Sequence, residues 1–431
     1  MGRTVDLSGP SLSWAQRMFA TYYRTRALPL PPEAERREYA LFPFDAPGMR
    51  RHMALDRASD LPQLLSSQSP RHVYYSSAYY DRPGHADMRQ KGWQGADVIF
   101  DLDADHLRGA EGRTYPQQLE LAKEKFLFLL DEFLFGDFGL EESEVTLAFS
   151  GGRGYHAHVH RPSFLRLRSD ERRELVDYIM GVGFDPEKDA LRHERIAIGP
   201  PSPDSFGGEG AEGWGDGTPG PSSRGPGRRL QEVMTLYPPQ EPGWRGRFSR
   251  ALERRLEIWE RRPLEEVTRE LSELGGLDPA RASQLAKELF QKGRARHIRE
   301  HHTLGSLSRR LGEDFLRALS RSIAVEVQGE TDAPVTTDIH RLIRLPGSLH
   351  GGTGFVVHPL RRSELDQFDP WSQALAFETP TPPVRIEVLS EVKYPFPTPL
   401  QAQAGERIDL EAPEALFLIL RGEGRVVAPS S

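Results

Sequence analysis

Three aspartates follow an apolar run in the stretch GADVIFDLDADHL. The run ADVIF (96–100) favours a buried strand, and Asp101, Asp103 and Asp105 come after it at alternate positions. Alternate residues of a strand point to the same face, so the three carboxylates would point the same way. Close carboxylates repel unless a cation lies between them, and Mg²⁺ and Mn²⁺ prefer such oxygen ligands. The alternative is a solvated strand end or a helix N-terminus, where aspartates are favourable.

A glycine-rich turn, SGGRGYH (150–156), lies between two runs with strand composition. Glycines such as Gly151 allow a sharp turn and a close approach of the backbone to a ligand. Ser150 offers a hydroxyl, Arg153 a guanidinium suited to phosphate oxygens, and His156 a further donor. This combination suits a nucleoside triphosphate. The alternative is a glycine-rich hairpin with an incidental arginine.

A third polar segment, ETDAPVTTDIHRLIRLPGSLHGGTGF, carries both acids and bases. Asp332 and Asp338 are candidates for a further carboxylate ligand. Arg344 and His350 flank LPGSL, whose Pro and Gly indicate a rigid turn. An arginine and a histidine facing a phosphate would complement the acids. The alternative is ordinary strand-edge charge and turn chemistry.

The surrounding sequence indicates which elements hold these residues. Three parts of the chain have strand composition, namely residues 72–80, 96–103 and 144–160. Short strand-like runs return from residue 322, beginning with SIAVEVQ, whereas apolar residues have helical spacing after Pro116 and over residues 246–321. Gly and Pro dominate residues 199–227, which we interpret as a disordered surface insertion. Strand-rich parts flank a helical middle, which predicts one α+β core with an inserted helical subdomain.

The composition is that of a soluble globular protein. Its 431 residues suggest roughly two to three domains. No apolar run approaches the roughly 20 residues needed to cross a bilayer, and no secretory signal is visible, so we expect a cytoplasmic protein with no membrane contact. Cys is absent, which excludes disulfides and thiolate metal sites. The net charge of −7 provides no global attraction for nucleic acid, so such binding requires local basic patches or a partner.

The segment QKGRARHIREHH (291–302) is a candidate for such a patch. Its closely spaced cations could contact the phosphates of a template strand, and they are Lys292, Arg294, Arg296 and Arg299. A solvated basic helix face explains the same pattern at least as well.

Three segments, taken in order, resemble the motifs of one protein family: DLDAD, SGGRGYH and RLIRLPGSLHGGTG. Together with RREYAL (36–41), they resemble the catalytic small subunit of archaeal and eukaryotic DNA primase. The resemblance covers residues 15–180 and 300–360 and implies a mixed-sheet primase catalytic core in the α+β class. The predicted divisions are a first part of the core at 1–165, a helical subdomain at 166–300 containing the insertion 199–227, a second part of the core at 301–375, and a closing segment at 376–431.

The resemblance also implies roles for individual residues. Asp101 and Asp103 match the metal-binding pair, and Asp332 matches the third catalytic aspartate. Asp338 lies closer to the LPGSL turn and matches less well, and Asp105 has no carried role. The residues that match the two arms contacting the triphosphate are Ser150, Gly151, Arg153, His156, Arg344 and His350.

The activity that the resemblance implies is primer synthesis on a single-stranded DNA template by metal-dependent nucleotidyl transfer. The implied cofactor is Mg²⁺ or Mn²⁺, the substrates are NTPs or dNTPs, and the partner is a primase large subunit in a heterodimer. Many relatives carry a zinc knuckle of Cys and His between the first two motifs. Here that interval is HLRGAEGRTYPQQLELAKEKF and the chain has no Cys, so we expect no structural zinc.

Two other functions remain open. One is a repair polymerase or stand-alone primase-polymerase of the same superfamily, and primer synthesis from nucleotides alone would separate these. The other is a non-catalytic nucleic-acid-binding subunit that keeps the fold. The intact aspartates and both basic arms argue against the second.

Overall fold

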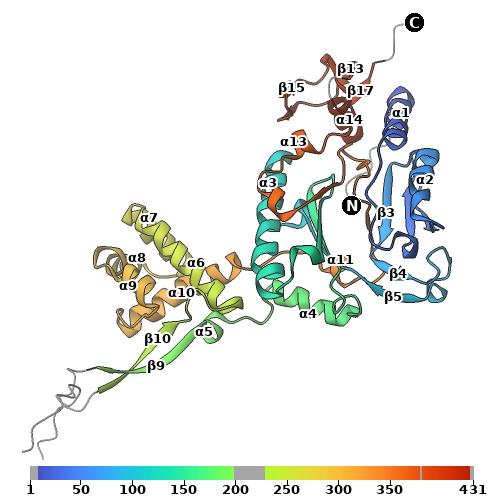
Figure 1. The fold of residues 1–431 in the computed structure, drawn as a ribbon. Coiled ribbons are helices and arrows are strands. Elements are labelled where there is room, and N and C mark those ends of the chain that lie inside the picture. The colour runs from blue at the N-terminus through green and yellow to red at the C-terminus, as the bar shows by residue number, and fades with distance from the viewer. Residues whose placement is uncertain (1–7, 199–228, 379–380, 428–431) are drawn as a thin grey trace, which may run out of the picture. The chain divides into compact units, whose positions relative to one another are not determined.

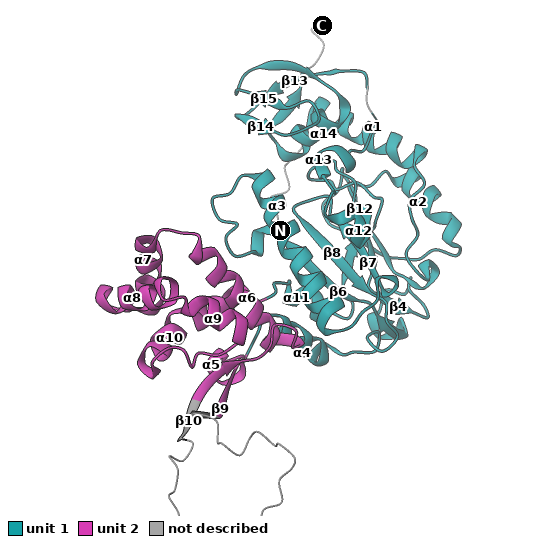
Figure 2. Ribbon diagram, turned by 60° about the vertical axis from the view of Figure 1, so that its left-hand side comes forward, with its two compact units in different colours: residues 1–182, 329–431 teal, residues 183–328 magenta. Residues whose placement is uncertain are grey.

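The computed structural model describes residues 8–198, 229–378 and 381–427, and the predicted insertion at 199–227 lies outside them. The chain forms two compact units, residues 1–182 with 329–431 and residues 183–328 (Figure 2). Helices and strands both occur throughout, which confirms the α+β class (Figure 1). All strand pairs within the described ranges are antiparallel, so the expected mixed sheet is instead a set of small antiparallel sheets. No helix in these ranges is long and apolar enough to cross a membrane.

The first sheet of the larger unit has the strand order β11–β3–β1–β2. Its strands are β1 (Tyr39–Phe42), β2 (Arg50–Met53), β3 (His72–Ser76) and β11 (Leu342–Arg344). The helices packed with it are α1 (Gly9–Thr25) and α2 (Leu61–Gln68). Phe19, Tyr23 and Leu65 of these helices are buried in the core cluster that includes this sheet. Because β11 pairs with β3, Arg344 lies opposite Tyr74 although the two are far apart in the sequence.

The second sheet of the larger unit has the order β12–β7–β8–β6 (Figure 2). Its strands are β6 (Val98–Asp103), β7 (Val145–Phe149), β8 (Gly154–Val159) and β12 (His358–Leu360). The nearby elements are α3 (Tyr115–Phe128), its π-helical continuation (Leu129–Asp137), α4 (Ser169–Ile179), α11 (Ala333–Thr337) and the hairpin β4 (Ala78–Tyr80) with β5 (Trp93–Ala96). Phe126 of α3 stacks on Tyr155, and all of β8 is buried. The pairing of β6 with β8 runs to Asp103 opposite Gly154.

The C-terminal part of the chain completes the larger unit. Its elements are α12 (Arg362–Leu365), α13 (Pro370–Gln373), β13 (Val384–Val388), β14 (Val392–Tyr394), β15 (Leu400–Ala402), β16 (Arg407–Leu410), α14 (Ala412–Arg421) and β17 (Gly424–Val426). Helix α14 is apolar and largely buried, and Phe417 packs against Trp371 and Tyr394. The backbone N–H of Val426 donates to Ser11 Oγ at 3.0 Å, so the end of the chain closes on α1.

The smaller unit is mainly helical. Its elements are α5 (Pro186–Asp189), β9 (Leu191–Ile198), β10 (Arg229–Leu236), α6 (Gly243–Glu260), α7 (Leu264–Gly275), α8 (Pro279–Ala286), α9 (Arg294–His301) and α10 (Arg309–Glu326). Residues 322–326 end α10, so the strand predicted from SIAVEVQ is wrong. Phe315, Leu319 and Ile323 recur at helical spacing and are buried, and this packing outweighs the strand preference of Ile and Val.

The boundaries of the two units differ from the predicted divisions at two places. Residues 166–182 belong to the larger unit, because α4 contacts α11 there. Residues 301–328 belong to the smaller unit, because α10 contacts α6 and α7. The segment 376–431 belongs to the larger unit together with both parts of the predicted core.

A buried ion pair joins the two main sheets of the larger unit. Asp97, immediately before β6, has no exposed surface, and its carboxylate lies 2.8 Å from Arg37 Nη1. The Tyr79 hydroxyl donates to the same carboxylate at 2.7 Å, and His160 Nδ1 lies 3.0 Å from it. Arg37 lies two residues before β1 and also donates to the Ser77 carbonyl. Burial alone would raise the pKa of Asp97, but its three partners more than offset this effect and lower the pKa to about 2.

Replacement of this buried carboxylate should destabilise the protein. Asp97→Asn leaves the buried guanidinium of Arg37 without its counter-charge. We expect a loss of about 3–5 kcal/mol in the free energy of unfolding, measured by urea denaturation. The matched control is Asp366→Asn, which removes a carboxylate paired with Arg362 at the surface and should cost no more than about 1 kcal/mol. Equal losses in the two variants would contradict the role assigned to Asp97.

The contribution of Asp97 should also depend on acidic pH. An unpaired aspartate has a pKa of about 3.9, whereas the pKa of Asp97 in the folded protein is about 2. A lowered pKa stabilises the fold above the unfolded value, and this contribution disappears as the pH falls from about 4 towards 2. Over that interval the free energy of unfolding should decline more steeply in the unmodified protein than in Asp97→Asn. Denaturation at a series of pH values measures this, and parallel curves would refute it.

Candidate active site

Strand β6 presents Asp101 and Asp103 on one face, as alternate residues. The strand ends at Asp103, whose carboxylate accepts a hydrogen bond from the backbone N–H of Asp105 and begins a 3₁₀ turn. Asp105 therefore leaves the strand, and its carboxylate pairs with Arg153. The strand-face argument holds for the first two acids and fails for the third.

Asp332 joins this pair from a distant part of the chain. Its backbone N–H donates to the carbonyl oxygen of Asp101 at 2.8 Å, and its carboxylate caps α11 at the N–H of Val335. The carboxylate of Asp338 instead accepts from the backbone N–H of His340. Of the two acids that the sequence left as candidates, Asp332 is the one that contacts Asp101.

The electrostatics of Asp101 reflect these acidic neighbours. Its side chain is only 16% exposed. Burial raises the pKa of Asp101 to about 7, and the charges of Asp103 and Asp332 contribute to this increase. Arg341 and Arg344 act in the opposite direction. The negative charge of the acid cluster therefore exceeds the positive charge of the groups around it.

The residues of the acid cluster fit a hard divalent cation. Their donors are carboxylate oxygens, which Mg²⁺ and Mn²⁺ prefer, and a cation would favour the ionised form of Asp101. In the described ranges, no three acidic or histidine side chains converge closely enough to form a complete metal cage. This arrangement matches a cation that is held partly by protein carboxylates and partly by substrate phosphates.

The turn between β7 and β8 is organised from within by Ser150. Its buried hydroxyl accepts hydrogen bonds from the backbone N–H groups of Gly152 at 3.1 Å and Gly154 at 3.2 Å. Gly151 has a φ of +73°, and a Cβ there would lie 2.7 Å from the Cβ of His350. The turn therefore packs directly against the segment around His350, and this close contact requires glycine at position 151.

His156 lies opposite Asp101 in the pairing of β6 with β8. Its Nε2 is 3.5 Å from a carboxylate oxygen of Asp101, and its buried Nδ1 has no hydrogen-bond partner among the described residues. Burial, followed by the charges of a neighbouring histidine and two arginines, keeps the pKa of His156 well below its ordinary value, so the ring is neutral. Arg153 lies 3.7 Å from Asp103 and pairs with Asp105.

Arg344 and His350 form a second basic arm beside the acids. Nη1 of Arg344 lies 2.6 Å from His72 Nδ1, and its guanidinium is 5.2 Å from the ring centroid of Tyr74. Nδ1 of His350 lies 3.1 Å from Thr353 Oγ1. Burial, followed by the charge of Arg344, keeps the pKa of His350 well below its ordinary value. His72 and Tyr74 of β3 therefore hold Arg344 of the second basic arm in place.

Three residues of this region were not among the predicted site residues. Arg71 donates from Nε to the carbonyl oxygen of Gly351 at 2.8 Å, His72 contacts Arg344, and Arg341 lowers the pKa of Asp101. The first two occur in the sequence PRHVYY, where charged residues adjoin an apolar strand. In DLD the polar residues follow an apolar run, whereas in PRHVYY they precede one. Polar residues at the end of a strand were therefore a sequence signal that could have identified Arg71 and His72.

The predicted template contacts lie in the smaller unit, at and just before α9. Two glutamates pair with all four cations. Glu288 lies 2.6 Å from Lys292 and 3.9 Å from Arg294. Glu260 lies 3.8 Å from Arg296 and also pairs with Arg299. Local acids therefore reduce the positive charge of this face, and its role in template binding stays a prediction.

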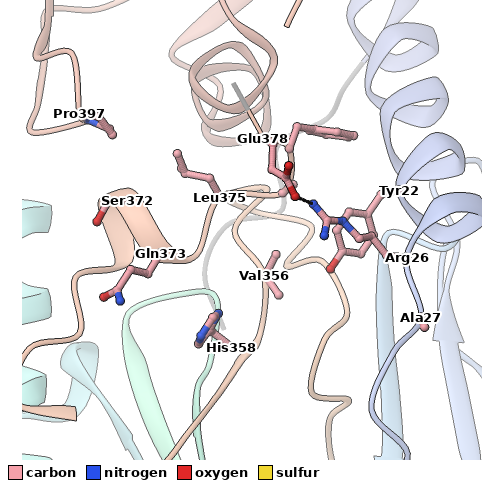
Figure 3. Close-up of a pocket in the computed structure, with 12 residues that line it drawn as sticks. Tyr22, Arg26, Ala27, Val356, His358, Ser372, Gln373, Leu375, Glu378 and Pro397 are labelled. Atoms are coloured by element: carbon pink, nitrogen blue, oxygen red, sulfur yellow. Dashed lines mark hydrogen bonds and ion pairs between the residues drawn. The ribbon is translucent and has the colours of Figure 1, made fainter. Parts of the chain in front are cut away.

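A separate cavity of about 660 Å³ lies in the larger unit, between the end of α1 and residues 372–378 (Figure 3). Arg26 Nη2 and Glu378 form an ion pair of 2.8 Å at its wall. The hydroxyl of Tyr22, which also lines the cavity, donates to the carbonyl oxygen of Gly347 at 2.7 Å. The acids and the two basic arms do not line this cavity, so we do not assign the chemistry to it.

Comparison with known proteins gives a consistent result. A family model described as DNA primase small subunit matches residues 100–362. DNA primase small subunit PriS of Methanothrix thermoacetophila is 38% identical over 96% of this chain and 98% of its own length. The proteins of the same name from Methanocella arvoryzae and Methanococcoides burtonii are 36% and 34% identical, over 87% and 94% of this chain and 88% and 95% of their own lengths. This chain therefore belongs to the DNA primase small subunit family.

Proposed function

We propose that this chain synthesises short primers on a single-stranded DNA template by metal-dependent nucleotidyl transfer from NTPs or dNTPs. The observation that carries the proposal is the grouping of three acids: Asp101 and Asp103 share a strand face, and the backbone of Asp332 is hydrogen-bonded to that of Asp101. Burial and the charges of the other two acids raise the pKa of Asp101. Buried groups with strongly shifted pKa values are candidates for functional sites, and here two basic arms lie beside them. Acids for a cation and cations for a triphosphate together support phosphoryl-transfer chemistry.

Asp101, Asp103 and Asp332 would hold Mg²⁺ or Mn²⁺. When bound, the cation supplies charge neutralisation for the substrate phosphates and favours deprotonation of the attacking hydroxyl. Arg153 and Arg344 would donate to the triphosphate and balance the charge of the departing pyrophosphate. The predicted phosphate contacts of Ser150, Gly151 and His156 belong to the same proposal.

His350 would contribute a directed N–H to the second arm. The backbone N–H of Gly352 donates to its Nδ1 at 3.2 Å, and this contact favours the tautomer with the ring proton on Nε2. A Cβ on Gly152 would lie 3.1 Å from that Nε2, so the donor is next to the glycine turn. A neutral histidine in this place donates a hydrogen bond to a phosphate oxygen without adding a full charge.

The partner proposed for this chain is a primase large subunit, since the relatives are named small subunits. The pairing of Lys292, Arg294, Arg296 and Arg299 with glutamates supports a shared template site rather than strong binding by this chain alone.

No structural zinc enters the proposal, and one zinc per chain in elemental analysis would contradict that. The family match does not favour a repair polymerase or a non-catalytic subunit, and primer synthesis without a supplied primer tests both.

Removal of the acid cluster should abolish primer synthesis. The variants are Asp101→Asn combined with Asp103→Asn, and Asp332→Asn alone, and each should lower kcat/KM by at least about a hundredfold because charge stabilisation is lost. The assay is primer synthesis from ATP on single-stranded poly(dT), with the large subunit present. Asp338→Asn is the matched control and should stay within about threefold of the unmodified protein. A double variant that still polymerises would refute the site.

Cation binding should also be visible without turnover. A ligand that binds only the folded state at a hundred times its Kd stabilises it by about 2.7 kcal/mol. Mn²⁺ should therefore raise the melting temperature of the unmodified chain, and ATP should enlarge the effect because phosphates complete the ligand set. Asp332→Asn should lose most of this increase, whereas Asp338→Asn should keep it. An increase that survives Asp332→Asn would place the cation elsewhere.

A further inference from the structure

His72 is a half-buried histidine at the start of β3, outside the motifs described above. Its Nδ1 faces two donors, Arg344 Nη1 at 2.6 Å and the backbone N–H of Gly351 at 3.1 Å. Both partners can only donate, so Nδ1 is unprotonated and the ring proton lies on Nε2. One acceptor atom is therefore shared by a side chain and a backbone group of the later segment.

Arg71, the residue before His72, also binds Gly351. Arg71 Nε donates to the carbonyl oxygen of Gly351 at 2.8 Å, so Arg71 and His72, the first residue of β3, contact both backbone polar groups of this glycine. A Cβ on Gly351 would lie 2.8 Å from His72 Nε2, which leaves no room for a side chain. The ring of His350, the preceding residue, meets the ring of His72 edge-on at 5.4 Å between centroids.

Arg344 depends on the same contact. Its hydrogen bond to His72 uses one of five N–H donors, and its guanidinium also rests near the ring of Tyr74. A long side chain that is already held in one conformation loses less entropy when it binds a phosphate. Burial, followed by the charges of Arg344 and Arg71, keeps the pKa of His72 well below its ordinary value. The acceptor therefore persists at neutral pH.

We infer that His72 is a positioning residue for nucleotide binding, which holds Arg344 and the His350–Gly351 turn in the arrangement that receives the triphosphate. This inference rests on the proposed function of the two basic arms. It assigns no contact with the substrate to His72 itself. Its effect passes through Arg344 and His350, so it should alter the affinity for the nucleotide more than the rate of the chemical step.

The test compares substitutions that remove or keep the acceptor. His72→Ala removes it, whereas His72→Asn keeps an amide oxygen near the position of Nδ1. In primer synthesis from ATP on poly(dT), His72→Ala should raise the KM for ATP by roughly tenfold or more, with a smaller change in kcat. His72→Asn should recover most of the loss. The Kd for ATP, measured by calorimetry with Mn²⁺ and the full chain, should follow the KM.

His358→Ala is the matched control for a merely structural histidine. His358 is also half-buried, but it lies on β12, at the sheet edge opposite β6, and its ring stacks on Phe368. Its loss should lower thermal stability and the active fraction without changing the KM for ATP. The same pattern in His72→Ala, or a failure of His72→Asn to restore the KM, would overturn the inference.

Two provisions keep the result separate from other failures. If His72→Ala does not fold, His72→Gln replaces it, because its longer side chain moves the acceptor away from the Nδ1 position and should weaken ATP binding where His72→Asn does not. Calorimetric affinity for ATP needs no turnover. A negative result at His72 is therefore distinct from failure of the acid cluster, which the double aspartate variant tests on its own.

Discussion

The larger unit depends on the neutralisation of Asp97. The backbone N–H of Asp97 donates to the Ser77 carbonyl at 2.9 Å, its carboxylate pairs with Arg37, and its carbonyl accepts from Arg172 of α4 at 3.0 Å. One residue thus connects the second sheet, the chain entering the first sheet and a covering helix. Because β6 begins immediately after it, the position of Asp101, four residues later, follows from this connection.

The same run of chain holds two buried carboxylates whose pKa values shift in opposite directions. Asp97 is surrounded by an arginine, a histidine and a tyrosine hydroxyl, and its pKa falls to about 2. Asp101 is largely enclosed, but the charges of Asp103 and Asp332 lie beside it, and its pKa rises to about 7. Burial acts in the same direction on both groups, so their neighbours decide the outcome. A completed ion pair indicates a structural role, whereas surplus negative charge at Asp101 supports the cation site that we propose.

Local patterns in the sequence predicted the elements of the site well. Three features of the site depend only on residues that are close together in the chain: the alternation in DLD, the strand ends and the glycine turn. The structure forms β6, β7 and β8 at the positions that these features predict. Contacts between distant segments were harder to predict. The pairing of β11 with β3 brings His72 to Arg344, and neither residue has a local feature that specifies the other.

Other differences arose where tertiary packing outweighed local preference. Residues 322–326 contain a strand-like run but complete a helix, because the buried face of α10 continues through Ile323. Asp105 continues the alternation of acids, yet the Asp103 carboxylate ends the strand by capping the next turn. The hydroxyl of Ser150 also accepts two hydrogen bonds from within its turn, a structural role that the sequence pattern did not indicate, and its phosphate contact stays a prediction.

The connection to the smaller unit affects which changes in chain length the site tolerates and the order in which its residues are synthesised. The N–H of Gly329 donates to the carbonyl oxygen of Ile179 at 2.9 Å, so the chain leaves and re-enters the larger unit at one point. The entropy of closing a loop grows slowly, by about 0.6 kcal/mol for each doubling of its length. A change in the length of the chain between these two points therefore adds little entropic cost to bringing Asp101 and Asp332 together. During translation, however, Asp101 and Asp103 emerge long before Arg344, so the second basic arm joins these acids only after the smaller unit has been synthesised.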